Sequence, residues 1–597
     1  MTTGERTVHA FPPWNLREYA LLADGERGAL VGPFGEVAWL CAPRWDSDPV
    51  FAGLIGGSGT YAVTPVGRFV PGGYYEDGSL IRRGGWVTGN GEVECREALA
   101  MPADPHRSVL LRRLTAEYGP ARVRLVLEPG TGFGPGRPGA AHRTDGGWTI
   151  RSGRLWLRWA GAGFARPGPG GQLTAELSLS PGEQLDLVLE VSDRRLDAPP
   201  PEPERCWRAT ERAWRHSVPN LYHTLDERDA RFSYAVLRGL TSRSTGGMVA
   251  AATTSLPERA EAGRNYDYRY VWIRDQCLAG QAVAACGPYQ LLDEAVRFTT
   301  DRLTEHGPRL APAYTVAGGR VPDQRAVDLP GYPGGHDQVG NRITRQFQLD
   351  VFGEALLLFA AAARRDRLDA NARSALRVAA DAIGRRWREP DTGIWELDER
   401  AWTHSRLICA AGLRAIAHPD VARPADVPQG LAAGWSALAD RIVSHTSRRA
   451  LHSRGRWQRS PGDPAVDLAL LLPPLRGALP AGDPRTSATL RACRDELTDG
   501  HFAYRFRHDD RPLAEAEGAF VLCGFLMALA EHQQGDAVEA ARWFEVTRGL
   551  CGSAGLFSEE YDVAQRRQRG NLPQAFVHAM MLECSARLAD SSPGRNP

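Results

Sequence analysis

The sequence predicts a two-domain protein in which an N-terminal antiparallel β-sandwich precedes an all-α (α/α)6 barrel, a toroid of six helical hairpins. A change in the period of the apolar residues and a proline-rich linker predict this fold. Apolar residues alternate with a period of two up to about residue 195, and they recur with a period near 3.6 from about residue 228. A proline-rich stretch, APPPEPE at residues 198–204, separates the two patterns. The length of 597 residues also exceeds what one ordinary core uses.

Residues 1–197 form the predicted sandwich domain. Short aliphatic or β-branched runs alternate with Gly, Pro and Asp turns, a pattern typical of antiparallel strands. The runs that predict strands are residues 30–31, 37–40, 61–63, 109–114, 123–127, 155–159 and 185–191. We expect residues 198–225 to be a linker, because the proline run favours an extended chain. A short helix over residues 206–217 should lead into the second domain.

Residues 226–590 carry the predicted helical barrel. About twelve segments show helical periodicity: 228–242, 275–286, 289–305, 343–365, 371–388, 405–417, 429–446, 464–473, 485–497, 517–533, 536–551 and 573–588. Their connections alternate between short and long, and long loops in compact domains are usually functional. An up-down array closed on itself places all the long loops at one end, so we expect the site there. Residues 591–597 are predicted to be a disordered tail.

The bulk composition excludes several classes of protein. A formal net charge of +1, with acids and bases evenly mixed, gives no indication of nucleic acid or an anionic membrane as a partner. The N-terminus lacks an apolar signal region, and a cytoplasmic location is expected. The ten cysteines do not show metal-ligand spacing, so we expect neither a metal nor a cofactor. A small-molecule substrate is the expected partner, and a homo-oligomer remains possible.

The densest cluster of aromatic and charged residues is NYDYRYVWIRDQCLAG at residues 265–280. It includes Tyr268, Trp272, Arg274 and Asp275. Aromatic faces stack on the C–H faces of a sugar, and charged groups bind its hydroxyls. The alternative interpretation is a strand-to-helix junction in which Asp275 caps the helix N-terminus.

Two other long connections carry carboxylates in aromatic surroundings. Glu396 lies beside Trp395, and a carboxyl group packed on an indole has the raised pKa that a general acid needs. Glu559 and Glu560 lie in GLFSEEYD, residues 555–562. Two carboxylates on opposite sides of a sugar ring can hydrolyse a glycosidic bond, one protonating the departing oxygen and the other activating water. Any one of these groups could be a solvated loop charge, but three such clusters on one predicted face favour a site.

Several blocks resemble the signatures of glycoside hydrolase family 15. They are DYRYVWIRD (267–275), LPGYPGG…VGN (329–341), QFQLDVFGE (346–354), GIWE (393–396), EGAFVLCGF (517–525), SEEYD (558–562) and GNLPQAF (570–576). Residues 36–57 resemble the sandwich domain of trehalase-like bacterial members. The resemblance implies an inverting, exo-acting hydrolase that releases β-glucose from the non-reducing end of trehalose or of malto- or isomalto-oligosaccharides.

The resemblance also implies roles for individual residues. Glu396 matches the general acid and Glu559 the general base of the family. Arg274 and Asp275 match the pair that binds the terminal glucose. Tyr268 and Trp272 match the aromatic positions of the same subsite. Trp395 is expected to bind substrate beside the acid. Glu560 is an alternative base, but Glu559 aligns with the family position, and neighbours in an extended loop point opposite ways. Asp398 departs from the Arg that many bacterial members carry, and the segment after Glu396 looks shortened.

Other polar groups receive weaker assignments. Asp350 and Glu354 lie four residues apart on one predicted helix, so they cannot flank a sugar from two sides and should have supporting roles. His404 is expected to cap a helix or support the site. Trp457, Gln458 and Asp467 could line the pocket or pack in the core. Two other functions stay open: an inverting α-glucoside phosphorylase, in which phosphate replaces the second carboxylate, and a catalytically inactive carbohydrate-binding protein.

Overall fold

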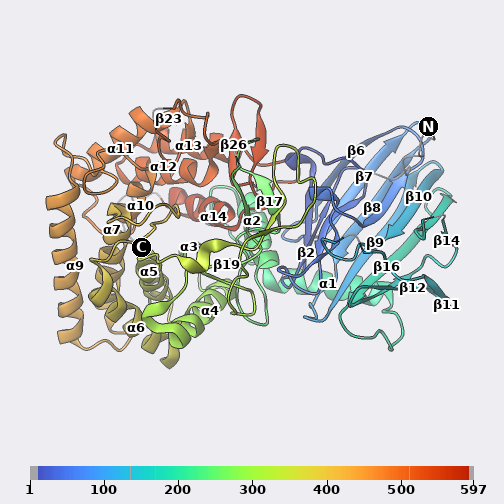
Figure 1. Ribbon diagram of the computed structural model, residues 1–597, viewed down its shortest axis with the longest axis horizontal. Coiled ribbons are helices and arrows are strands. Elements are labelled where there is room, and N and C mark those ends of the chain that lie inside the picture. Colours follow the sequence, from blue (N-terminus) through green and yellow to red (C-terminus); the bar gives the residue numbers. More distant parts are fainter. Residues whose placement is uncertain (1–10, 135, 169, 262, 510, 591–597) are drawn as a thin grey trace.

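The structure is a computed structural model that describes residues 11–134, 136–168, 170–261, 263–509 and 511–590, so the predicted tail, residues 591–597, lies outside the described residues (Figure 1). Its N-terminal part consists of antiparallel sheets. The smallest of them has the order β1 (Ala20–Ala23), β2 (Gly28–Val31), β3 (Val37–Cys41), β4 (Pro49–Phe51). The next has the order β14 (Arg166–Pro167), β15 (Leu173–Leu179), β10 (Ala121–Glu128), β5 (Thr60–Pro65). The largest has the order β11 (His142–Thr144), β12 (Gly147–Ser152), β13 (Leu155–Ala160), β16 (Gln184–Ser192), β9 (Arg107–Tyr118), β8 (Glu92–Leu99), β7 (Arg82–Thr88), β6 (Phe69–Tyr75).

The two larger sheets share one apolar cluster. On β10, Val123 and Leu125 are buried while Arg122 faces solvent, the alternation that the sequence showed. Leu110 and Leu114 of β9 belong to the same cluster. Every predicted strand lies within an observed one. The sequence did not reveal β6, whose side chains are mostly exposed, since a strand without a buried face carries no apolar alternation.

The helix α1 (Pro203–Ser217) begins earlier than the predicted linker helix, so the extended conformation expected for residues 198–204 is wrong at its C-terminal end. Glu202 caps the helix by accepting hydrogen bonds from the amides of Glu204 (2.9 Å) and Arg205 (2.6 Å). Pro203 fits the first turn because its missing N–H would have no helical partner there.

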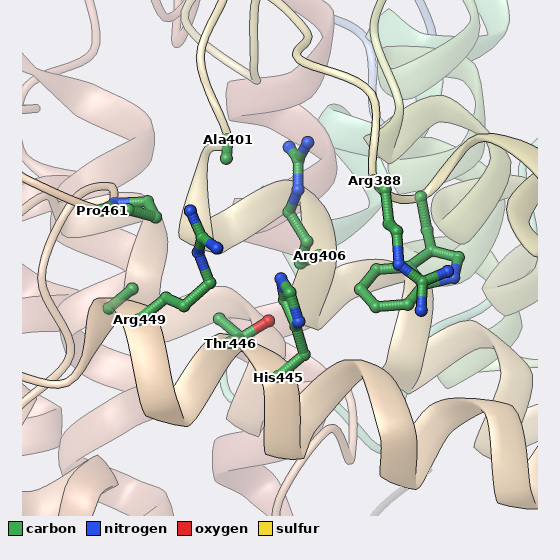
Figure 2. A pocket seen from close by; sticks show the side chains of 9 residues that line it. Arg388, Ala401, Arg406, His445, Thr446, Arg449 and Pro461 are labelled. Atoms are coloured by element: carbon green, nitrogen blue, oxygen red, sulfur yellow. The ribbon is translucent and has the colours of Figure 1, made fainter.

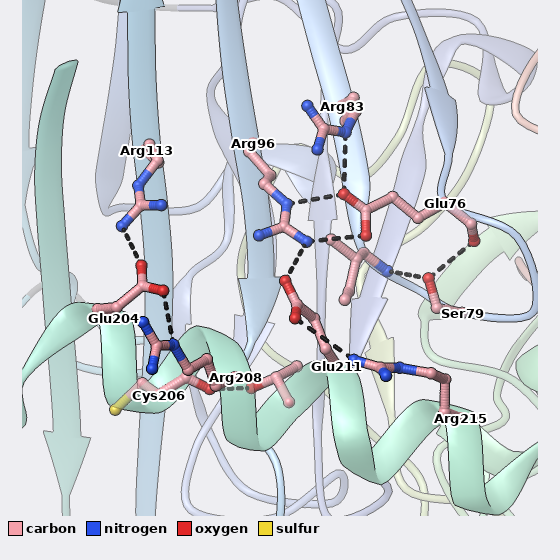
Figure 3. Close-up of polar contacts among 12 residues, drawn as sticks. Glu76, Ser79, Arg83, Arg96, Arg113, Glu204, Cys206, Arg208, Glu211 and Arg215 are labelled. Atoms are coloured by element: carbon pink, nitrogen blue, oxygen red, sulfur yellow. Dashed lines mark hydrogen bonds and ion pairs between the residues drawn. The ribbon is translucent and has the colours of Figure 1, made fainter.

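Ion pairs hold α1 on the largest sheet (Figure 3). Arg96 of β8 contacts both Glu76 and Glu211, at 2.7 and 2.8 Å. Arg113 of β9 contacts Glu204 at 3.2 Å. The helix is therefore attached to the sheet at two turns and does not act as a free tether.

The C-terminal part is helical and lies on the left of Figure 1. Its helices are α2 (Glu227–Leu240), α3 (Ile273–Cys286), α4 (Gln290–His306), α5 (Asp350–Arg364), α6 (Ala370–Arg386), α7 (Thr403–Ala417), α8 (Pro419–Ala422), α9 (Gln429–Ala450), α10 (Leu472–Leu475), α11 (Pro484–Leu497), α12 (Val521–Gln533), α13 (Ala537–Arg548) and α14 (Ala575–Ala589). Among the described residues, no helix combines the length and the apolar character needed to cross a bilayer.

Two kinds of helix alternate along this part. Almost every side chain of α3 is buried, whereas α6 buries a stripe at Ala372, Ala375, Leu376 and Ala379. The enclosed helix α3 packs against α5 and α14, α5 against α7, and α14 against α12. The helices α2, α4, α6, α9 and α13 each pack against at least one of these.

Short strands and 3-10 turns occupy the connections. The strands are β17 (Thr254–Pro257), β18 (Asn265–Asp267), β19 (Val271–Trp272), β20 (Ala313–Tyr314), β21 (Arg325–Ala326), β22 (Gln338–Val339), β23 (Thr498–Asp499), β24 (Phe502–Ala503), β25 (Ala519–Phe520), β26 (Glu560–Asp562) and β27 (Arg567–Arg569). The 3-10 turns are η1 (Leu16–Glu18), η2 (Gly53–Ile55), η3 (Gly307–Arg309), η4 (Arg342–Arg345) and η5 (Leu468–Leu471).

Three predicted helices differ clearly from the observed ones. The helix predicted over residues 343–365 is split, with the turn η4 before α5. The helix predicted over residues 464–473 is the turn η5 followed by the single turn α10. The helix predicted over residues 517–533 starts only at Val521, because the preceding residues pair as β25 with β26.

The sheets and the helices share a buried core near the site. The indole N–H of Trp39, on β3, donates to the carbonyl of Ala252 at 3.0 Å. Arg269, just before β19, donates to the carbonyl of Ser47 at 2.9 Å. The segment that carries the aromatic cluster is thus anchored on the N-terminal sheets.

Candidate active site

The segment of residues 265–272 places two aromatic side chains in contact with each other. Arg269 is buried and binds both carboxylate oxygens of Asp267, at 2.9 and 2.7 Å, which fixes the backbone between β18 and β19. Tyr268 and Trp272 meet edge to face, with their ring centroids 5.4 Å apart. Tyr266 stacks on the other side of Tyr268 at 6.2 Å. The ion pair between Arg269 and Asp267 therefore fixes the backbone that carries the rings of Tyr268 and Trp272.

Glu396 lies in the loop between α6 and α7 and contacts this aromatic pair. The indole N–H of Trp272 donates to its Oε1 at 2.7 Å, and Nη2 of Arg274 lies 3.7 Å from the same oxygen. Its φ of 57° lies in the left-handed region, a costly conformation for a residue other than glycine. Burial raises the pKa of the Glu396 carboxyl, while the positive charge of Arg274 opposes the rise.

Glu559 approaches the same aromatic pair from the loop between α13 and α14. The hydroxyl of Tyr268 donates to its Oε1 at 2.9 Å. Within the described residues its buried Oε2 has no hydrogen-bond partner. Gly570, with a φ of +75°, packs on it so closely that a Cβ there would lie 2.8 Å from the Cβ of Glu559. Burial and the neighbouring Glu258 raise the pKa of the Glu559 carboxyl, and Arg505 opposes them.

Two aromatic side chains from one segment therefore connect carboxylates from two distant loops. Trp272 binds Glu396, Tyr268 binds Glu559, and the two rings touch each other. These contacts bring three separate segments of the chain together at one place.

Arg274 and Asp275 belong to the first turn of α3. The helix begins at Ile273 with Trp272 at its N-cap, so the interpretation of Asp275 as the capping residue is wrong. Nε of Arg274 donates to Asp275 at 3.1 Å, and its Nη1 donates to the carbonyl of Ile394 at 2.6 Å. Burial raises the pKa of Asp275 to about 6, against the lowering effect of Arg274. The pair links α3 to the loop that carries Glu396.

Trp395, the neighbour of Glu396 in the sequence, contacts two residues of later segments. Its indole N–H donates to Asp467 at 2.8 Å, and its ring meets Phe520 edge to face at 5.4 Å. The indole that hydrogen-bonds Glu396 belongs to Trp272. Asp467 thus contacts the site through Trp395. Trp457 is fully buried, consistent with the core-packing alternative.

A buried ionic cluster lies behind Glu559. Nη2 of Arg505 lies 3.3 Å from Glu258, 2.5 Å from Glu517 and 3.3 Å from Glu560. These carboxylates are close enough together to hold a cation, and the guanidinium lies among them. Glu517 and Glu560 stand in two of the family-like sequence blocks, but only the fold brings them together with Arg505 and Glu258.

Glu560 faces this cluster and Glu559 faces the aromatic pair. Oε2 of Glu560 accepts from the amide of Gly518 at 2.7 Å. Since Glu560 begins β26, its side chain points to the side opposite that of its predecessor.

Two other buried polar groups lie near Arg274. Both carboxylate oxygens of Asp350 lack hydrogen-bond partners in the described part of the chain, and burial raises its pKa to about 7. His404 likewise has no partner there, and burial together with Arg274 lowers its pKa to about 3. His404 is the second residue of α7, so it does not cap that helix. Glu354, one turn after Asp350, accepts from Gln281 at 2.8 Å.

Two carboxylates on separate loops, aromatic rings between them and an Arg–Asp pair beside them are the features of a glycoside hydrolase site. The model of glycosyl hydrolases family 15 matches residues 233–586, and that of the trehalase-like N-terminal domain matches residues 10–214. The chain belongs to glycosyl hydrolase family 15 and is an O-glycoside hydrolase by its family.

Curated relatives resemble the chain over nearly its whole length. A trehalase of Mycobacterium tuberculosis is 30% identical over 96% of this chain and 89% of its own length. A trehalase of Mycolicibacterium smegmatis is 29% identical over 97% and 92%. A bacterial glucoamylase solved with acarbose has the same fold, with a TM-score of 0.73 over 98% of this chain and 96% of its own, at 13% identity.

Proposed function

We propose that this enzyme is an inverting, exo-acting α-glucosidase in which Glu396 is the general acid and Glu559 the general base. The connection of the two carboxylates through Trp272 and Tyr268 carries the proposal. Glu396 has a raised pKa, as a group that must donate a proton requires. The unpartnered Oε2 of Glu559 leaves a lone pair with which to orient and deprotonate water.

The proposed reaction uses one water and one inversion. Glu396 protonates the glycosidic oxygen as the bond to the anomeric carbon breaks. Glu559 takes a proton from the water that attacks that carbon from the other face, which gives β-glucose. We expect a separation of about 6.5–9.5 Å between the two carboxyl groups, the distance that leaves room for the water.

Arg274 and Asp275 are proposed to bind the hydroxyls of the terminal glucose. Their pairing with each other and with the Glu396 loop fixes them beside the acid. Tyr268 and Trp272 would stack on the sugar, and Trp395 would contact the leaving group. Buried, charged groups that bind the terminal glucose at the closed end of a pocket leave no room for further sugar residues. This arrangement favours exo action.

We infer that the helical part is a closed (α/α)6 barrel around this site. Among the described helices, α3, α5, α7, α10, α12 and α14 each contact the next, and α14 contacts α3. The helices α2, α4, α6, α9, α11 and α13 each contact a member of that ring, which supports a second, outer layer. The long connections carry the carboxylates, as the sequence predicts. The cytoplasmic location and a homo-oligomer stay predictions.

Trehalose is the substrate that we favour. The relatives named trehalases match this chain across both of its parts at up to 30% identity, whereas the glucoamylase similarity concerns the fold. Malto- and isomalto-oligosaccharides are the second candidates. Asp398, where many bacterial members carry an arginine, is exposed on the Glu396 loop.

A panel of trehalose, maltose, isomaltose and maltotriose, followed by proton NMR from the first minute, tests the proposal. Inversion of trehalose gives α- and β-glucose in equal amounts before mutarotation, and inversion of the other sugars gives β-glucose from the cleaved end. Glucose released from trehalose only in the α form would contradict inversion.

Cleavage that requires phosphate would favour the phosphorylase. If Glu396→Gln and the wild type bind sugar equally and neither cleaves any of the four, the chain is a binding protein.

A further inference from the structure

A cavity of about 370 Å³ lies on the N-terminal sheets. Its lining comes from residues 11–13, from the glycine-rich segment 53–60 and from the ends of the strands β3, β5 and β10. Both ends of the sequence block 36–57 take part, and this block contributes nothing to the proposed active site. Pockets that hold small molecules measure about 300–1,000 Å³, so the cavity is large enough for one.

The charge of the lining excludes an anionic ligand. Glu36 and Glu128 contribute carboxylates, and the lining residues that the structure describes include no lysine, arginine or histidine. By contrast, the cavity between α7 and α9 is lined by Arg388, Arg406 and Arg449 (Figure 2). Carboxylates accept hydrogen bonds, so the cavity on the sheets suits a ligand that carries several hydroxyl donors.

The other lining groups suit the ring of a sugar. Phe11 and Tyr19 contribute aromatic rings, on which the C–H face of a sugar can pack. Gly53 has open space where a side chain would start, because the nearest atom to a Cβ there, the carbonyl oxygen of Ala38, would be 3.8 Å away. A ligand can therefore approach the backbone closely along the glycine-rich segment.

Two buried polar side chains of the lining have hydrogen-bonding capacity left over. The hydroxyl oxygen of Tyr19 accepts from the amide of Trp14 at 3.0 Å, and its own proton has no acceptor among the described residues. The carboxylate oxygens of Glu36 accept from the indole N–H of Trp14 at 2.5 Å and from the amide of Phe34 at 3.1 Å. A carboxylate offers about four acceptor positions. Sugar hydroxyls can thus donate to Glu36 and accept from Tyr19.

The loop of residues 329–335 holds two parts of the lining in place. The hydroxyl of Tyr332 donates to the carbonyl of Trp14 at 2.7 Å, which anchors the segment that follows residues 11–13. The amide of Gly331 donates to the carbonyl of Ile55 at 3.0 Å, within the glycine-rich segment. The cavity is therefore largely preformed, and a ligand loses little free energy in ordering it.

We propose that this cavity binds a neutral sugar, a mono- or disaccharide, between residues 11–19 and the glycine-rich segment 53–60. The sugar hydroxyls donate to Glu36 and Glu128 and accept from Tyr19, while a C–H face packs on Phe11. The site belongs to the sheets and shares no residue with the proposed catalytic site. It does not rest on the proposed function.

The test is hydrogen–deuterium exchange of the full chain, followed by mass spectrometry, because this method locates the bound sugar. Glucose is added to the wild type, and trehalose to Glu559→Gln, in which trehalose should not be consumed. Either sugar should slow the exchange of residues 49–60 saturably, independently of any protection near residues 265–275. Glycine betaine at equal concentration is the control for the general stabilising effect of osmolytes.

A variant that occupies the cavity tests the location. Gly53→Phe should lose the protection of residues 49–60, because its side chain has room to enter the cavity without moving the backbone. Gly89→Phe is the matched control: this exposed glycine in the turn between β7 and β8 also has open space at its Cβ position. It should be protected as the wild type is.

A second variant keeps the test decisive if Gly53→Phe does not fold. Glu128→Gln changes an exposed carboxylate of the lining and should raise the sugar concentration for half-maximal protection by about 3- to 10-fold. The proposal is overturned if neither sugar protects residues 49–60 beyond the effect of betaine, or if protection is confined to the proposed active site. Wild-type protection in a folded Gly53→Phe, or unchanged affinity in Glu128→Gln, would also overturn it.

Discussion

At the scale of single residues, Tyr268 has the most consequential position. Its hydroxyl is the only hydrogen-bond partner of the Glu559 carboxylate that the described residues provide, and its ring touches Trp272. It thus connects the proposed base to the indole that binds the proposed acid. A residue of this kind affects the orientation of one carboxylate and the pKa of that carboxylate together.

Replacing Tyr268 by Phe should lower kcat/KM by about 10- to 100-fold, the worth of a hydrogen bond to a charged group. The lost bond stabilised the ionised form of Glu559, so its pKa should rise and the acid limb of the pH–rate profile should move to higher pH. Steady-state kinetics from pH 4 to 9 measures both effects. Tyr266→Phe, which removes a hydroxyl from the stacked neighbour, is the control; an equal loss in both variants would argue against this role.

Glu258→Gln should move the acid limb the other way. The negative charge of Glu258 raises the pKa of Glu559, so its removal lowers that pKa and lets the base ionise at lower pH. The same kinetic titration should therefore show activity retained to lower pH than in the wild type. Glu261→Gln, an exposed glutamate on the same segment, should leave the profile unchanged. An acid limb that moves upward in Glu258→Gln would contradict the electrostatic argument.

At the scale of elements, the loop between α6 and α7 is held at its base by Asp391. This buried carboxylate binds Arg406, the hydroxyl of Ser405 at 2.8 Å and the amide of Gly393 at 2.9 Å. Backbone bonds between Asp391 and Arg400 close the loop into a hairpin. The left-handed backbone at Glu396 is compatible with this rigid base, because the surrounding bonds determine the conformation.

Asp391→Ala should destabilise the protein by about 3–5 kcal/mol, since it leaves the Arg406 charge buried without its partner. Urea denaturation followed by circular dichroism measures the free energy of unfolding. Asp398→Ala, on the exposed part of the same loop, should change it by less than about 0.5 kcal/mol. Similar losses in the two variants would show that the buried pair does not hold the loop.

The same loops show where sequence reasoning succeeds and where it stops. Long buried helices such as α3 and α14 are rich in small and apolar residues over a length too great for a strand, and the sequence predicts their ends within a few residues. β25 lies in a predicted helix because its partner β26 is about forty residues later, and pairing at that distance leaves no local pattern. The motifs supplied Glu396 and Glu559, whereas Arg505 and Glu258 emerge only when the fold brings their segments together.

At the scale of the whole molecule, the N-terminal sheets serve the site directly. The apolar cluster that contains Trp39 and Leu54 of the sheet region continues into Met248 and Ile273 of the helical region. Arg269 spans the boundary, binding Asp267 on one side and the carbonyl of Ser47 on the other. The position of Tyr268, its neighbour in sequence, therefore depends on both parts.

Because one buried cluster crosses the boundary, the two parts should unfold together. Differential scanning calorimetry should show a single transition for the full chain, and Arg269→Met should lower its midpoint without splitting it. That variant should also lose activity, since Tyr268 and Trp272 lose the backbone support beneath them. Arg259→Met, a nearby arginine outside these contacts, is the control. Two separate transitions, or an active fragment of residues 226–590, would show that the sheets are dispensable for the site.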